Sequence, residues 1–244
     1  MSRRLSLLPV LLLMLALPAA ADSLLTVKSH TDAFQVDGET QPARDTTIKI
    51  WVSTDKLRRD DADSSAILRL DLNRLYVLRH ADKTWSALPL PIDFVRLMPK
   101  GSEQTGALWA QQMQLTVQVK PTQEKKTFGA WAARKLGMSI TNATGMKIES
   151  TLWLSQDVPT WPALNRLAAT LAALQPGSAA WVDALEKLDG FPVLREDRVE
   201  AMGARINTRE ELQTVETRDA PTGTYDPPAD YKEAPFNPLA DLGG

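Results

Sequence analysis

The feature that most constrains the fold is the strict alternation of apolar and polar side chains from Met113 to Lys120. Every odd position there is apolar and every even position is polar, which is typical of a strand with one buried and one solvated face. The pattern recurs between Ser23 and about Gln156, so we predict a mainly β fold built on an antiparallel sheet. Other alternating segments lie at 48–53, 135–140 and 146–149.

Short polar stretches separate these predicted strands. Connections of this length are typical of hairpins between neighbouring antiparallel strands. We therefore predict one continuous meander from Ser23 to about Gln156. The polar stretches lie at 53–56, 71–74, 80–83 and 141–145.

The pattern changes at Val158. Pro162 precedes a set of apolar residues spaced at i, i+3, i+4, i+7 and i+10, the stripe of an amphipathic helix begun by a proline. Ser178 is a suitable N-cap for a second helix, and Gly190 stands just beyond the end of that helix. We predict a helical hairpin with helices near 160–175 and 179–189. The stripe consists of Leu164, Leu167, Ala168, Leu171 and Leu174.

Strand-like sequence resumes near Phe191 and continues to Thr217, so we expect the sheet to extend past the helices. Five of the sixteen prolines follow Asp219, which predicts an extended tail with disordered final glycines. The domain organisation that we predict is a signal peptide, a single domain with a curved sheet, and a C-terminal tail. Their bounds are 1–21, 22–218 and 219–244.

The N-terminus has the three parts of a secretory leader. Arg3 and Arg4 precede an apolar run, and Ala19 to Ala21 are small residues of the kind that a signal peptidase reads. The apolar run is shorter than the roughly 20 residues that span a bilayer, which argues against a membrane anchor. We predict cleavage after Ala21 and a soluble periplasmic or secreted protein without a permanent membrane span; the sequence leaves open which of the two compartments.

Composition argues against several function classes. The net charge of −2, without a long basic run, argues against nucleic-acid binding. The chain has no cysteine and only two histidines, His30 and His80, so disulfides and thiol chemistry are excluded and multi-histidine metal sites are poorly supported. The common hydrolase, metalloprotease and nucleotide motifs are absent. We predict no enzymatic activity, no metal and no cofactor, and we interpret both histidines as surface residues rather than catalytic ones.

An acidic cluster at 60–65 superficially suggests calcium. When Asp61 is taken as the first position of an EF-hand loop, Ala66 stands where the turn needs glycine. Leu72 stands where the bidentate glutamate should be. We therefore interpret the cluster as a solvated turn between strands.

The tryptophans are the most informative aromatic residues. Of the seven, Trp51 and Trp153 fall on the polar phase of their strands, where large rings mark either a binding surface or a face covered by other elements. In the packing interpretation, the helices or the tail cover them. In the functional interpretation, aromatic rings and adaptable methionines line a concave face that binds an apolar guest. The ligand-binding candidates are Trp51, Trp131, Trp153, Met138 and Met146.

Several short phrases together resemble a known family. They are Thr31–Phe34, Leu75–Leu78 with Asp82–Trp85, Leu188–Leu194, and Gly223–Tyr225 with Tyr231–Lys232. The chain resembles, from Asp22 to Phe236, the secreted bacterial family called domain of unknown function 4412, which is similar to periplasmic lipoprotein carriers of the LolA/LolB type. The resemblance implies a half-open antiparallel β-barrel around an apolar cavity, with a helical lid.

One departure from the family lies at 129–136, where relatives often have a cysteine near Ala133 and a tyrosine near Leu136. A thiol role in relatives therefore does not carry over. The resemblance implies a non-enzymatic protein that binds an acyl chain, a lipid or a lipid-modified protein. The alternative is a structural or protein-interaction module of the cell envelope, with a core filled by its own side chains. The sequence leaves the oligomeric state open.

Overall fold

Most strands of the chain join one twelve-stranded sheet, seen in a computed structural model that describes residues 21–36, 38–201, 203–236 and 238. The predicted leader lies outside these ranges except for Ala21, and so do the final glycines. The first half of the sheet is formed by β1 Ser23–Thr31, β4 Arg44–Val52, β5 Lys56–Asp60, β6 Ser64–Arg69, β7 Arg74–Arg79 and β8 Thr84–Pro89. The second half is formed by β9 Thr116–Phe128, β10 Trp131–Thr141, β11 Lys147–Ser155, β12 Phe191–Ala201, β13 Ala204–Thr217 and β14 Lys232–Glu233.

The remaining elements stand outside this sheet. A small hairpin is formed by β2 Phe34–Val36 and β3 Glu39–Gln41. The helices are η1 Leu70–Leu72, α1 Phe94–Leu97, α2 Glu103–Gln112, α3 Trp161–Ala172 and α4 Ala179–Glu186. Helices α3 and α4 end a few residues before the predicted bounds of 175 and 189.

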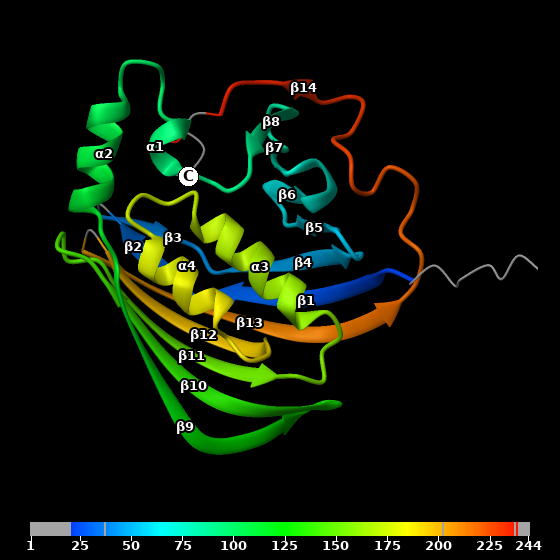
Figure 1. Ribbon diagram of the computed structural model, residues 1–244. Coiled ribbons are helices and arrows are strands. Elements are labelled where there is room, and N and C mark those ends of the chain that lie inside the picture. The colour runs from blue at the N-terminus through cyan, green and yellow to red at the C-terminus, as the bar shows by residue number, and fades with distance from the viewer. Residues whose placement is uncertain (1–20, 37, 202, 237, 239–244) are drawn as a thin grey trace, which may run out of the picture.

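The strand order is β14-β8-β7-β6-β5-β4-β1-β13-β12-β11-β10-β9. All pairs are antiparallel except β14 with β8. Strand β1 lies in the middle of the sheet, between β4 and β13, and thereby joins the N-terminal and C-terminal groups of strands. The predicted antiparallel sheet is confirmed as a large curved sheet (Figure 1).

The sheet does not close, because the edge strand β9 does not pair with the strands at the other edge. The barrel prediction is therefore confirmed only as far as the curvature. In Figure 1, the strands from β12 to β9 bend strongly beneath the helices. The result is an open trough with a concave and a convex face.

The predicted continuous meander is wrong between β8 and β9. These strands follow each other in the chain but lie near opposite edges of the sheet, and α1 and α2 occupy the connection. Met113, which we predicted to begin a strand, is the C-cap of α2. Helix α2 packs on α1 through the rings of Phe94 and Trp109, whose centroids are 5.4 Å apart. Because α2 also leaves Leu108 exposed, it lacks the apolar stripe by which a helix packed on the core is recognised.

The C-terminal tail follows the outside of the sheet. The backbone N–H of Lys232 donates to the carbonyl of Lys83, and that of Ala234 donates to the carbonyl of Trp85. Earlier in the tail, Arg58 Nη1 donates to the Thr224 carbonyl over 3.0 Å. These hydrogen bonds hold the tail against β5 and β8.

Candidate ligand cavity beneath the helical hairpin

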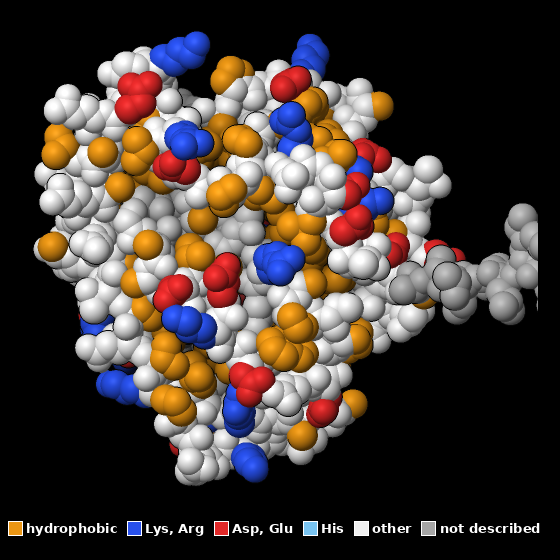
Figure 2. All heavy atoms as spheres, viewed as in Figure 1, with side chains coloured by type: hydrophobic (Ala, Val, Ile, Leu, Met, Phe, Trp, Pro, Cys, Tyr) orange, Lys and Arg blue, Asp and Glu red, His pale blue; other side chains and the backbone are white. Residues whose placement is uncertain are grey.

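A cavity of about 520 Å³ lies between the concave face of the sheet and the hairpin α3–α4. Its walls are largely apolar. The strands contribute Ile48, Ile50, Met138, Ile140, Ile148 and Leu152, among others, and the helices contribute Leu164, Leu167, Leu171 and Leu185. Hydrophobic side chains also reach the surface on the side that carries the two helices (Figure 2).

Strand periodicity places the wall residues of β10 and β11 on one face. Ile140 lies opposite Ile148, and Met138 lies opposite Ser150, so these positions share the concave side. On α3, residues spaced by three and four positions face the same direction. The Leu stripe predicted from the sequence therefore turns toward the cavity, with Leu167 only 3% exposed.

Close backbone contacts fix both ends of the hairpin. Gly177, in the connection between α3 and α4, has a φ of +70°, and a Cβ there would lie 2.6 Å from the Met113 backbone. Its carbonyl accepts a hydrogen bond from Leu115 N–H over 3.0 Å. At the other end, Gly190 has a φ of +131°, and a Cβ would come within 2.8 Å of Ser155. Both positions require glycine, so the hairpin is held at a fixed height over the sheet.

A buried amide ties the two helical segments together. Asn165 Nδ2 donates to the carbonyl of Leu188 over 2.9 Å, and Asn165 itself is buried. Because a buried amide is costly unless it is hydrogen-bonded, this contact orients α3 with respect to the end of α4. Helices α3 and α4 thus cover the cavity in a fixed mutual orientation.

The five predicted ligand-binding residues do not come together. Met138 and Met146 line the cavity, whereas Trp51, Trp131 and Trp153 are not among its lining residues. Ligand contact by the two methionines stays a prediction.

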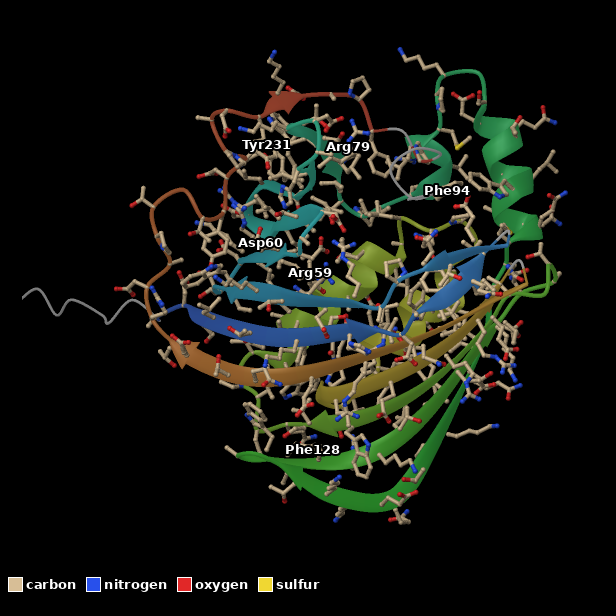
Figure 3. The ribbon with its side chains drawn as sticks, turned by 180° about the vertical axis from the view of Figure 1, so that it is seen from behind. Arg59, Asp60, Arg79, Phe94, Phe128 and Tyr231 are labelled. Carbon is tan, nitrogen blue, oxygen red and sulfur yellow. The ribbon has the colours of Figure 1, made fainter. Side chains whose placement is uncertain are left out.

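Each of these tryptophans instead packs elsewhere. Trp153 meets Phe128 edge to face, with centroids 5.3 Å apart, and the Arg218 guanidinium lies 5.5 Å from the Trp51 ring centroid. Trp131 is partly buried and packs against the larger core cluster, to which Trp153 and Phe128 also contribute. Figure 3 shows Phe128 at the strongly curved end of the sheet.

The tryptophan that does line the cavity is Trp181 of α4. Sequence reasoning placed it only on the apolar side of the second helix, together with Val182 and Leu185. A helical stripe indicates which residues face the sheet, but not which of them border open space. Trp51 and Trp153 were chosen as candidates because they occupy the polar phase of their strands. That phase lies on the convex face of the sheet, away from the cavity.

Three ionisable side chains also line the cavity: Arg59, Arg195 and Glu210. Arg59, labelled in Figure 3, lies on β5 and forms an ion pair with Asp61. Arg195 on β12 is directly opposite Glu210 on β13, and Arg195 Nη2 lies 2.6 Å from Asp197 Oδ2. These charged positions were not predicted, because charges on β12 and β13 resemble those of a solvated strand.

The surroundings of Arg195 stabilise its charge. Burial acts to lower the pKa of Arg195, but the negative charges of Asp197 and Glu210 outweigh it and hold the pKa above its ordinary value. A charged guanidinium therefore faces a largely apolar cavity. Glu210 lines the cavity beside it, whereas Asp197 is not among the lining residues.

The described ranges hold no cluster of three or more histidine, aspartate or glutamate side chains that could bind a metal ion. In the acidic cluster, Asp61 accepts hydrogen bonds from the backbone N–H groups of Asp63 and Ser64, the contacts of a turn between strands. None of the helices in the described part of the chain is long and apolar enough to cross a bilayer.

Comparison with known proteins gives one family match. Residues 137–231 match the family model described as domain of unknown function (DUF4412), which confirms the resemblance over the segment that contains α3, α4, β12 and β13. The match does not extend over the N-terminal strands, which the short phrases had included.

The solved structures include one described as an outer membrane lipoprotein-sorting protein domain from Vibrio parahaemolyticus. It shares 8% sequence identity with this chain, and the comparison covers 82% of this chain and 86% of the other, with a TM-score of 0.28. No curated protein matches the chain.

Proposed function

We propose that this chain, whose residues 137–231 match the family of unknown function described above, is an exported carrier that binds an acyl chain or similar apolar ligand without catalysing a reaction. The observation that supports the proposal is the cavity of about 520 Å³ between the concave sheet and α3–α4. Its volume lies within the roughly 300–1,000 Å³ of small-molecule sites.

The lining suits a flexible guest. A cavity without contents leaves its apolar wall atoms without partners on one side, so a hydrocarbon chain gains dispersion contacts by entering it. Met113, Met138 and Met146 all line the space, and methionine side chains adjust their shape to irregular ligands. A guest with several rotatable bonds fits such walls better than a rigid one.

The ligand has a way in beside α3. Ala168 lines the cavity and is nevertheless exposed, and Leu171, one turn further, is only partly buried. Solvent therefore reaches the cavity wall along this side of the helix. Because the hairpin is held at Gly177 and Gly190, we take the exposed side of α3 as the entrance to the cavity.

The leader predicted from the sequence places the proposed carrier outside the cytoplasm. In that setting, an apolar cavity shields an acyl chain from water between two membranes or before secretion. The supporting observation is the run of Arg3, Arg4, apolar residues and Ala19 to Ala21.

The test is to purify the cleaved protein, extract it with organic solvent and identify bound lipids by mass spectrometry. The Ala168→Phe variant should fill the cavity and lower the amount of bound lipid several-fold. Ala180→Phe, at an exposed position on α4 outside the lining, is the matched control and should retain it. If neither extraction nor titration with acyl ligands yields binding, the alternative of an envelope interaction module is the better interpretation.

A further inference from the structure

When the ionisable side chains that line the cavity are counted together with the ion-pair partners of the two arginines, Glu210 is left as an excess negative charge, which bears on the ligand's head group. Arg195 pairs with Asp197 over 2.6 Å, and Glu210 lies directly opposite Arg195 across the β12–β13 ladder, so one guanidinium stands between two carboxylates. The other cationic lining residue, Arg59, is paired with Asp61 and does not offset the excess. Among the lining residues, the apolar ones dominate and no further ionisable group is present.

The hydrogen bonds of this cluster are also incomplete. The side chain of Glu210 makes no hydrogen bond within the described ranges, although the residue lies opposite Arg195 in register. In the same part of the chain, the Nε of Arg195 and the Oδ1 of Asp197 are buried without a hydrogen-bond partner. Buried polar atoms are nearly always paired in folded proteins. The excess hydrogen-bonding capacity therefore consists of two carboxylates that can accept and one N–H that can donate.

We infer that the cavity selects an amphiphile whose head group donates hydrogen bonds and carries no negative charge, with Glu210 as the accepting residue. The inference rests on the proposed function, because it describes the head group of the ligand that the apolar part of the cavity would hold. Hydroxyl, amide and ammonium head groups share this chemistry. A fatty acid carboxylate does not.

Electrostatics explains the selection. A second anion close to Glu210 and Asp197 is repelled, and the repulsion is stronger in a low-dielectric cavity than in water. Arg195 cannot fully compensate, because its charge is already engaged by the two carboxylates. A hydroxyl or ammonium group instead donates to Glu210 and avoids burying a third negative charge.

The experiment compares three ligands of equal chain length below their micelle concentrations: laurate, monolauroylglycerol and dodecylamine. We expect wild-type protein to bind at least one of the two donor ligands about tenfold more tightly than laurate, a difference of about 1.4 kcal/mol. The two donor arms distinguish a neutral from a cationic head group. Isothermal titration calorimetry measures all three affinities.

The variant Glu210→Gln removes the excess charge and keeps a side chain of similar shape, so laurate affinity should rise by about tenfold. The control is Glu211→Gln, the next residue on β13, which lies on the opposite face and pairs with Arg209 over 3.2 Å. It should leave the order of affinities unchanged.

The outcomes separate this inference from the proposed function. If no ligand binds, the proposed function fails and the inference falls with it. If laurate binds as tightly as both other ligands, or more tightly, the proposed carrier function is supported and the head-group inference is overturned. An unchanged laurate affinity in Glu210→Gln also overturns it. If this variant does not fold, the wild-type comparison alone decides.

Discussion

The hydroxyl of Tyr231 lies 2.7 Å from Nδ1 of His80, so a residue of the C-terminal tail is bonded to the end of β7. The other ring nitrogen of His80 lies 3.1 Å from the hydroxyl of Ser65, a buried residue of β6. Figure 3 shows Tyr231 on the side of the molecule where the tail crosses the sheet. His80, which we interpreted from the sequence as a surface residue of a turn, is thus the link between the tail and two strands.

Tyr231→Phe should lower the free energy of unfolding by about 1 kcal/mol, because it removes the hydrogen bond to His80 and keeps the ring. Tyr76→Phe makes the same chemical change at a hydroxyl without a hydrogen bond in the described ranges and should be nearly neutral. Urea denaturation of both variants measures the difference. An equal effect of the two substitutions would show that the His80 contact adds nothing.

Leu167→Asp should lower the free energy of unfolding by roughly 3 kcal/mol, because it places a charge where the wild-type side chain is 3% exposed. Arg166→Asp, at the exposed neighbouring position, should cost little. Leu171→Asp should cost less than Leu167→Asp, since Leu171 is only partly buried, and should instead weaken acyl binding. Wild-type stability in Leu167→Asp would show that the stripe does not face the sheet.

Binding of an acyl ligand should change the fluorescence of Trp181, which lines the cavity. Trp181→Phe should remove most of the signal while calorimetry still detects binding. Trp153→Phe should keep the signal, because that ring packs on Phe128 away from the cavity. This differs from the expectation from the sequence, in which Trp51, Trp131 and Trp153 are the tryptophans that contact the ligand. A signal lost only in Trp153→Phe would restore that expectation.

The pKa of His30 should lie above the ordinary histidine value of about 6.5, because the hydrogen bond to Asp45 raises it. A raised pKa means that the folded state binds the proton more tightly than the unfolded state. The resulting stabilisation is fully present below the unfolded-state pKa and is lost as the pH rises through the folded-state pKa. In Asp45→Asn, the imidazole resonances followed by NMR should titrate closer to 6.5; an unshifted curve would contradict this assignment.

The mature protein should begin at Asp22. Cleavage there would leave the sheet intact, because the Asp22 carbonyl accepts a hydrogen bond from Arg218 N–H over 2.9 Å and β1 begins at the next residue. Ala21→Arg should block cleavage, since the peptidase site needs a small residue there. Mass spectrometry of the exported fraction measures the N-terminus. An intact chain beginning at Met1 in the wild type would refute the leader assignment.

Local periodicity alone predicted much of the fold. Alternation identified the strands that carry Met138 and Ile148 and the face on which those side chains lie, because successive strand residues point to opposite sides. The Leu stripe identified α3 in the same way, through the helical period. Helix α2 was not predicted, because it packs on α1 rather than on the sheet. It therefore needs no continuous stripe of apolar residues.

The candidate site depended on contacts that periodicity does not encode. Trp181 borders the cavity because of the hairpin's height over the sheet, which the close approaches at Gly177 and Gly190 set.

The sequence by itself determined which faces are apolar, since a side chain's direction follows from local backbone geometry. Only the tertiary structure decided that Arg195 and Glu210 lie on the concave face and that β1 joins β13 to β4. Those relations arise from strand register and sheet order, which depend on how segments distant along the chain pack together.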